Sequence, residues 1–413
     1  MFKPMFVPPR DNPLMVRLVN SVLPVAAHLL ANIRDVEVPP EDFAHLRELH
    51  AHRALLSPNH PTGMDPVVLL WVSRMLGRSF NYLAAREALQ GPKGWLLNQV
   101  GAYSVIRGIA DRESLRTTRR LLAEQDRKVV IFPEGEVYEH NDRLLAFQSG
   151  VAQIGFWALD DLVKAGKTAA LPILPVAIKY RCVDSPRPAI ENGLRGLERA
   201  LNLAPAANLG AYQRLCRIGD RVISTLERQV GLPVSEGGDL GPRIAAGRQR
   251  MLQRVAEAIH VEVNEEQSPA DQIHLLFHEL KEWVGTLPED ASDYDRRLYG
   301  HRVEVATPLF NDLQRLQSFI AVTGDYVAAE ATAERFLDVM GRLEQEVFGE
   351  VRNRVPRQAL VRIAPPIPLE ERYDDYRKNK RAVVAAVTGD LETAIRGMLQ
   401  ELSRRSTPIA LDA

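Results

Sequence analysis

Between about residues 53 and 180, short β-type runs alternate with stretches of helical pattern, and this alternation limits the possible folds more than any other feature of the chain. Strands are predicted at 54–56, 81–84, 102–106, 128–132 and 170–180, and helices at 67–76, 92–100, 111–124 and 149–164. The order is typical of strands joined by crossover helices. The sequence therefore predicts an α/β fold in which helices flank a mixed sheet.

The chain changes in character after residue 180. Residues 186–356 have a mostly helical pattern, broken by stretches rich in glycine and proline at 231–233 and 237–242. A strand is predicted again at 359–363, followed by a long helix to about residue 402. We therefore expect an N-terminal amphipathic helical segment (1–48), an α/β core to which the chain returns (49–185 and 357–405), and a helical insertion or subdomain (186–356).

Charge and cysteine content narrow the class of protein. The 413 residues include 52 Lys and Arg and 53 Asp and Glu, so the net charge is -1. This balance gives no overall attraction to nucleic acid, and no nucleic-acid partner is expected. The two cysteines, Cys182 and Cys216, have neither a second pair for a zinc cluster nor the spacing of a disulfide framework. We therefore expect a protein of the cytosolic side, without a bound metal.

An apolar stretch at 14–33 is interrupted by several polar residues. Its apolar residues recur at helical spacing on one side, which predicts an amphipathic helix bent near Pro24. A bilayer span needs roughly 20 consecutive apolar residues, and no segment is expected to meet that requirement. Two interpretations of the helix stay open: it packs on the core, or it lies among lipid headgroups at a membrane surface.

A histidine and an aspartate five positions apart, His60 and Asp65, follow the first predicted strand. The intervening Pro61, Thr62 and Gly63 allow a turn that brings the two side chains together. The carboxylate can then hold one ring nitrogen protonated and leave the other as a general base near neutral pH. No Gly-x-Ser-x-Gly sequence supplies a protein nucleophile, so the base is expected to activate a hydroxyl of a bound substrate. By itself the pair is more typical of a structural histidine in a turn, and Asp65 is also a natural N-cap for the next helix.

Three further blocks follow this pair in order: Gly101-Ala102-Tyr103-Ser104-Val105-Ile106-Arg107, Phe132-Pro133-Glu134-Gly135 and Leu174-Pro175-Val176-Ala177-Ile178. In their order and spacing after the His-x4-Asp pair, they resemble the motif blocks of the glycerolipid acyltransferase family, the lysophosphatidic acid and glycerol-3-phosphate acyltransferases. The resemblance covers roughly residues 50–180, with a weaker similarity in the terminal strand and helix from about residue 359.

The resemblance implies an acyltransferase whose catalytic residues are His60 and Asp65. His60 would take the proton from an acceptor hydroxyl as that hydroxyl attacks an acyl thioester, and Asp65 would orient the histidine. The acyl donor would be acyl-CoA or acyl-carrier protein, which is a co-substrate, and no other cofactor and no metal is implied. The acceptor would be a lysophospholipid-like or glycerol-phosphate compound.

The same resemblance implies a set of substrate-binding residues. Arg107 would grip the phosphate of the acceptor, a role that a guanidinium suits through paired hydrogen bonds. Glu134 and Gly135 would form the acceptor-binding turn, where glycine lets the backbone approach the ligand. Pro175 would help to shape the acyl-donor side. Neighbours in the same blocks complete the set: Gly101, Phe132 and Pro133.

The chain departs from the family pattern in two of the blocks. The third block usually continues with a small hydroxyl residue and often an arginine, whereas this chain has Glu136-Val137-Tyr138-Glu139. An added carboxylate beside a phosphate site is electrostatically unfavourable, so a different lysolipid, or a non-phosphorylated alcohol or amine, is an alternative acceptor. In the second block, Ser104 replaces a bulky apolar residue.

Location and two rival functions complete these expectations. Long acyl chains are insoluble in water, so we expect a peripheral position on the cytoplasmic side of a membrane surface, with residues 14–33 as the first candidate for the contact. One rival function is a thioester hydrolase that uses the same His-Asp pair with water as the acceptor. The other is a catalytically silent lipid-binding scaffold whose helical insertion recruits partners.

Overall fold

The computed structural model describes residues 6–106, 111–135, 137, 139–167, 170–204, 206, 208–235, 237–264, 267, 269–285, 287, 291–320, 326–352 and 355–410, with only the backbone described at 270, 274 and 317–320. The chain divides into two compact units. The first, called here the core unit, comprises Phe6–Asp184 and Val355–Ser406. The second, called the helical unit, contains Ser185–Arg354 and the chain from Thr407.

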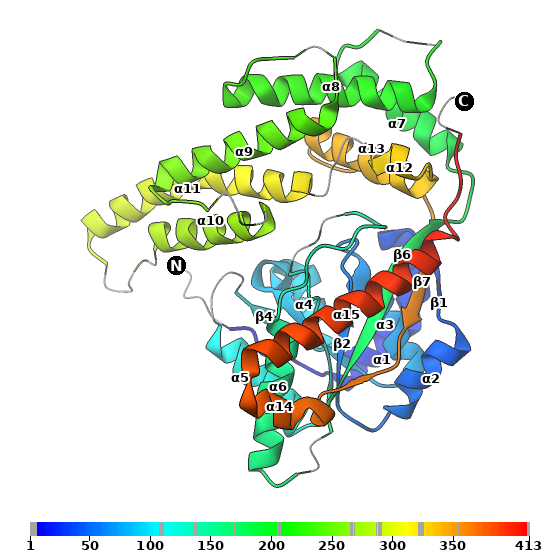
Figure 1. Cartoon of the computed structure of the whole chain (residues 1–413), viewed down its shortest axis with the longest axis vertical. Coiled ribbons are helices and arrows are strands. Elements are labelled where there is room, and N and C mark those ends of the chain that lie inside the picture. Colours follow the sequence, from blue (N-terminus) through cyan, green and yellow to red (C-terminus); the bar gives the residue numbers. More distant parts are fainter. Residues whose placement is uncertain are drawn as a thin grey trace. The chain divides into compact units, whose positions relative to one another are not determined.

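The core unit is built on one eight-stranded sheet with the strand order β1-β7-β6-β2-β5-β3-β4, and β8 pairs with β6 beside this path (Figure 1). The strands are β1 (Ile33–Glu37), β2 (Ala54–Pro58), β3 (Phe80–Ala85), β4 (Ala102–Val105), β5 (Lys128–Val130), β6 (Pro172–Cys182), β7 (Arg357–Ile363) and β8 (Ile367–Pro368). Strands β6, β2, β5, β3 and β4 pair in parallel, whereas β7 and β8 run antiparallel to β6. The predicted α/β fold with a mixed sheet is confirmed, and the strand expected at 359–363 joins this sheet as β7.

Helices cover both faces of the sheet, because successive residues of a strand point to opposite faces. In β2, Leu56 enters the apolar cluster beneath α1, α2 and α3, while Leu55 enters the cluster beneath α5, α6 and α15. The helices of the core unit are α1 (Pro13–Ala31), α2 (Pro40–Glu48), α3 (Asp65–Leu76), α4 (Gly91–Gln99), α5 (Arg112–Ala123), α6 (Gly150–Lys164), α14 (Tyr373–Lys378) and α15 (Lys380–Ser403), with short 3-10 turns η1 (Arg86–Leu89) and η2 (Glu370–Arg372). Figure 1 shows α5, α6 and α15 on the near side of the sheet and α1 and α3 on the far side.

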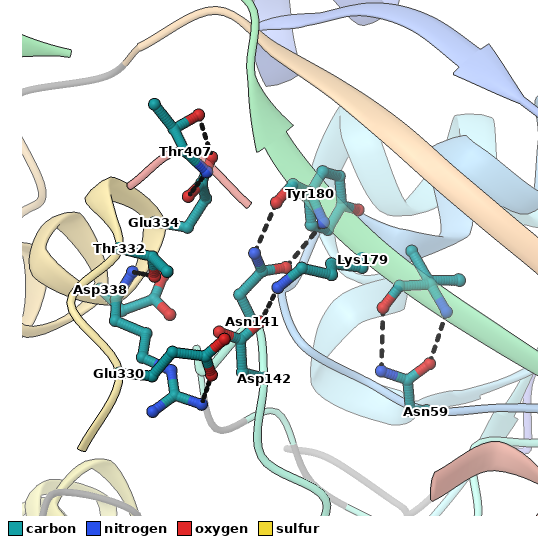
Figure 2. Close-up of polar contacts among 12 residues, drawn as sticks. Asn59, Asn141, Asp142, Lys179, Tyr180, Glu330, Thr332, Glu334, Asp338 and Thr407 are labelled. Atoms are coloured by element: carbon teal, nitrogen blue, oxygen red, sulfur yellow. Dashed lines mark hydrogen bonds and ion pairs between the residues drawn. The ribbon is translucent and has the colours of Figure 1, made fainter. Parts of the chain in front are cut away.

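The helical unit has the pattern that the sequence predicts for residues 186–356. Its helices are α7 (Arg187–Ala200), α8 (Ala211–Val230), α9 (Leu240–Ile259), α10 (Pro269–Val284), α11 (Asp293–Ile320), α12 (Tyr326–Ala329) and α13 (Ala333–Phe348). They enclose two apolar clusters, one between α9, α10 and α11 and the other between α7, α8 and α13. Glu334 of α13 accepts hydrogen bonds from the backbone N–H and the hydroxyl of Thr407, at 2.9 and 3.0 Å, which ties the end of the chain to this unit (Figure 2).

The N-terminal segment protects an open edge of the sheet. Strand β4 is the last in the order, and its Ser104 donates its N–H to the carbonyl of Val7 at 3.0 Å while its hydroxyl accepts the N–H of Val7 at 2.8 Å. Asn98 donates from its side chain to the carbonyl of Pro8 at 2.7 Å. A strand edge covered in this way is not available for pairing with another chain. The serine that replaces an apolar residue in the second block therefore has a structural reason, because only a polar side chain can accept this N–H.

Helix α1 has one side that packs on the core and an opposite side that is apolar and exposed. It packs on the core through Leu23, Ala27 and Ala31. Its opposite side exposes large apolar residues, namely Leu14, Leu18, Val22, Val25, Leu29 and Leu30. Among the described residues it is one helix of 19 residues that is long and apolar enough to cross a membrane, by length and composition only. The expectation that no segment would reach this length and apolarity was therefore wrong.

Gly101, the residue before β4, has a backbone conformation that only glycine adopts readily. Its φ is +103°, and a Cβ at this position would lie 2.6 Å from the carbonyl oxygen of Phe80 and 2.9 Å from Oδ1 of Asp11. The backbone oxygen cannot move aside without disturbing β3. This glycine is therefore needed for the packing of the sheet edge.

Replacing Gly101 with alanine is expected to lower the free energy of unfolding by about 3 kcal/mol, because strain and overlap with backbone add together. Urea denaturation followed by circular dichroism measures the change. Gly389→Ala in α15 is the matched control, because a Cβ there meets no atom within 4 Å and alanine favours a helix by about 1 kcal/mol. Equal stability of Gly101→Ala and the unaltered protein would contradict the packing role.

Candidate active site

The predicted catalytic histidine lies where β2 leaves the sheet. β2 ends at Pro58, and Asn59 then fixes the turn to the neighbouring strand β6. The side chain of Asn59 donates to the carbonyl of Ile178 at 3.0 Å and accepts the N–H of Ile178 at 2.7 Å, so it pairs with β6 as a strand residue would (Figure 2). His60 therefore starts from a fixed point at the carboxyl end of a central strand, which is where α/β sheets place ligand sites.

His60 and Asp65 are in direct contact. Nδ1 of His60 lies 2.6 Å from Oδ2 of Asp65, and the Asp65 side chain has no solvent exposure. Asp65 is the first residue of α3, whose N-cap is Met64, so the prediction that Asp65 is the N-cap was wrong. The reason is local: its carboxylate turns back over the preceding turn to meet the histidine instead of capping the helix.

The buried Asp65 carboxylate accepts further hydrogen bonds on both oxygens. The backbone N–H of Thr62 donates to Oδ2 at 2.9 Å and its hydroxyl to Oδ1 at 3.1 Å, while the phenol of Tyr180 donates to Oδ1 at 2.6 Å. A carboxylate that is ionised only accepts, so Nδ1 of His60 carries the proton in this contact. In the neutral ring Nε2 is then the nitrogen without a proton, and no described residue forms a hydrogen bond with it.

The plane of the histidine ring is set by Phe132. The two rings are stacked, with centroids 3.8 Å apart and an angle of 16° between their planes. Phe132 follows β5, which pairs with β2, so the adjacent strand supplies one wall for the ring. The His60 side chain keeps 11% of its surface exposed. A ring that is stacked and hydrogen bonded in this way is oriented before any substrate binds.

Glu134 holds the histidine from the backbone side. It is buried, with its Oε1 accepting the N–H of His60 at 2.7 Å and its Oε2 accepting the N–H of Leu145 at 3.1 Å. Burial raises the pKa of Glu134 to about 7, although the N–H groups of His60 and Leu145 act in the opposite direction. The carboxylate that the sequence assigned to the acceptor thus contacts the protein itself in this structure.

The turn after β5 requires glycine at its last position. Gly135 has a φ of +75°, and its N–H donates to the carbonyl of Phe132 at 3.3 Å. A Cβ there would lie 2.7 Å from the side-chain amide of Gln148, whose backbone N–H donates to the carbonyl of Pro133 at 2.8 Å. The third block is therefore a closed turn that packs against the segment just before α6.

The segment that follows the third block is attached to β6 and to the histidine turn. Asn141 donates to the carbonyl of Tyr180 at 2.5 Å and accepts its N–H at 2.7 Å, and Asp142 forms a buried ion pair with Lys179 (Figure 2). Glu139 accepts the N–H of Gly63 at 3.3 Å. Asn141 and Asp142, which follow the third block, thus attach this segment to β6, and Glu139 attaches it to the histidine turn.

The structure brings together only part of the predicted set. His60 contacts Asp65, Phe132 and Glu134, and Pro133 and Gly135 lie in the same turn as Glu134. Pro175 is buried in β6, where it lies opposite Ser57 of β2 in the strand pairing. Ser57 is three residues before His60 in the sequence.

Two other predicted residues are not brought to this cluster. Gly101 comes just before β4, at the opposite end of the parallel strands from His60, and Arg107 lies outside the described residues. Thr62 and Tyr180 contact Asp65 but were missed. Within the described part of the chain, no group of three or more His, Cys, Asp or Glu residues could hold a metal ion.

The raised pKa of Glu134 predicts a pH-dependent stability. Its pKa rises from 4.5 in the unfolded chain to about 7 in the fold, so its favourable contribution is complete below pH 4.5 and is lost as the pH rises through 7, by about 3 kcal/mol. In Glu134→Gln this group no longer titrates. The free energy of unfolding of the unaltered protein should therefore fall relative to Glu134→Gln as the pH rises from 4.5 to 8. A difference that stays constant in urea denaturation over this range would contradict the assignment.

Comparison with known proteins agrees with this geometry. Residues 34–179 match the family model described as Acyltransferase, and the match contains His60, Asp65, Phe132 and Glu134. No curated protein matches the sequence significantly. The matched segment runs from β1 into β6 and therefore includes the strands that carry the histidine and the third block. Residues 34–179 belong to the glycerolipid acyltransferase family with the His-x4-Asp motif, and the chain that carries them is an acyltransferase.

Proposed function

We propose that the protein transfers a fatty acyl group from acyl-CoA or acyl-carrier protein to a hydroxyl of a lysophospholipid-like or glycerol-phosphate acceptor, with His60 as the general base. The observation that carries this proposal is the 2.6 Å contact between Nδ1 of His60 and Oδ2 of Asp65. In the neutral ring this contact places the proton on Nδ1 and leaves Nε2 free to accept one, and the side chain is 11% exposed. A general base needs such a nitrogen.

The reaction follows from this protonation state. Nε2 of His60 accepts the proton of the acceptor hydroxyl while the hydroxyl oxygen attacks the thioester carbonyl carbon. The tetrahedral intermediate collapses with cleavage of the carbon–sulfur bond, and the imidazolium returns its proton to the departing sulfur. The products are an ester and a free thiol, and no covalent acyl-enzyme forms. The negative charge of Asp65 stabilises the imidazolium between the two proton transfers.

The immediate surroundings favour this use of the histidine. Phe132 fixes the ring plane, and Glu134 fixes the backbone N–H of the same residue. The remaining freedom of the side chain is small, so little reorganisation is needed when the acceptor arrives. A histidine with only a packing role would not need this many separate constraints.

The acceptor and the membrane contact are inferred from the substrate chemistry. The family resemblance assigns the acceptor phosphate to Arg107, and the acyl chains are insoluble in water. We propose that the exposed apolar side of α1 lies among the lipid headgroups on the cytoplasmic side of a membrane. Leu14 and Leu29 are each 71% exposed on this side, and the first turn of α1 carries no acidic residue that would oppose an anionic surface.

Loss of the base should abolish acyl transfer. His60→Ala is expected to lower kcat/KM by about 1,000-fold, within the range of general-base catalysis. The assay incubates the protein with labelled acyl-CoA or acyl-carrier protein and a panel of lysolipids, glycerol 3-phosphate, and uncharged alcohols and amines, and the product is identified by mass. His52→Ala, an exposed histidine just before β2, is the control and should retain activity.

The same assay separates the rival functions. Loss of acyl-CoA with release of free fatty acid, and without an acylated acceptor, would contradict acyl transfer and indicate a hydrolase. Full activity of His60→Ala would contradict the role of the histidine. The acceptor that is acylated decides between phosphorylated and non-phosphorylated compounds.

The exposed side of α1 should control binding to lipid vesicles. Leu14→Glu with Leu29→Glu is expected to lower the bound fraction about 10-fold on vesicles of phosphatidylcholine and phosphatidylglycerol, because two apolar side chains no longer enter the interface. Tyr294→Glu in α11, at a side chain that is 68% exposed, is the control. Sedimentation with vesicles measures the bound fraction. Equal binding of the α1 variant and the unaltered protein would exclude α1 as the membrane contact.

A further inference from the structure

Tyr180 contacts Asp65 of the His60–Asp65 pair. It lies in β6, two residues after the end of the fourth motif block at Ile178. It is 1% exposed, and its phenol donates to Oδ1 of Asp65 at 2.6 Å. The family match ends one residue earlier, at 179. His60 uses Oδ2 and Tyr180 uses Oδ1, so the two residues bind opposite oxygens of one carboxylate.

The phenol is held firmly in the donating state. Burial and the adjacent charge of Asp65 raise the pKa of Tyr180 well above its ordinary value, so the hydroxyl keeps its proton. The guanidinium of Arg357, in β7, lies 4.5 Å above the centre of the ring, and a cation over an aromatic face is attracted to it. Asn141 binds both backbone groups of Tyr180. Elements far apart in the sequence thus fix one hydroxyl.

We propose that Tyr180 is a positioning residue that tunes the Asp65–His60 pair for acyl transfer, an inference that rests on the proposed function. A hydrogen bond to Oδ1 withdraws negative charge from the carboxylate and fixes its rotamer. The carboxylate then still orients Nδ1 of His60 but binds the imidazolium less tightly than an unshared charge would. Removing the phenol should therefore strengthen the attraction between Asp65 and the protonated form of His60.

Two substitutions at this position test the proposal in opposite directions. Tyr180→Phe keeps the ring beneath Arg357 and removes only the donor. We expect a kcat about 10-fold lower with little change in KM, and an acid limb of the kcat/KM profile about one pH unit higher. Site-specific replacement of Tyr180 by 3-fluorotyrosine makes the hydroxyl a stronger donor, so the acid limb should move to lower pH.

A matched control separates tuning from folding. Tyr376 is a fully buried tyrosine of α14 whose hydroxyl accepts from Gln153 at 3.2 Å, away from His60 and Asp65. Tyr376→Phe should leave the acid limb in place, whatever it does to the melting temperature. If both Tyr180 variants keep the acid limb of the unaltered protein, the proposal is wrong and Tyr180 has only a packing role. Should Tyr180→Phe fail to fold, the shift with 3-fluorotyrosine decides alone.

The proposed acyl transfer itself is tested by a different variant, His60→Ala. If His60→Ala retains acyl transfer, the proposed function fails, whatever the result at Tyr180. If His60→Ala is inactive while the Tyr180 variants behave as the unaltered protein, the proposed function stands and only this inference fails.

Discussion

The site depends on one buried charge, the carboxylate of Asp65. Removing a carboxylate from water costs several kcal/mol unless hydrogen bonds replace the lost hydration. Here the replacement comes from the turn before α3, through Thr62 and His60, and from β6, through Tyr180. The turn cannot change shape without leaving part of this charge unsatisfied. The geometry of the His60–Asp65 pair is therefore tied to the stability of the core unit.

Strand β6 is the element to which the parts of the site attach. It lies between β2, which leads into the histidine turn, and β7, which comes from the part of the core unit that follows the helical unit. Asn59 and Asn141 each bind both backbone groups of a β6 residue, and Arg357 of β7 covers the ring of Tyr180. The C-terminal strand thus supports the site from outside the family match. The core unit must include both parts of the chain for this support to exist.

The sequence predicted what depends on near neighbours and missed what depends on distant ones. His60 and Asp65 are five positions apart, so a turn of Pro61, Thr62 and Gly63 was enough to predict their contact. Tyr180 lies 115 positions from Asp65, and nothing in its neighbours indicates a buried acceptor. The family resemblance assigned Gly101 and Glu134 to substrate binding, whereas their contacts within the protein became visible only in the structure: backbone crowding around the glycine, and two backbone N–H groups that donate to the glutamate.

The two buried carboxylates act on His60 in complementary ways. Glu134 binds its backbone N–H, so it fixes where the residue lies, and Asp65 binds Nδ1, so it fixes which ring nitrogen carries the proton. Both negative charges would repel an anionic acceptor, but Asp65 shares its charge among donors that surround it, and burial favours the neutral form of Glu134 up to about pH 7. The repulsion between an anionic acceptor and these two acidic residues is therefore weaker than two full negative charges would give.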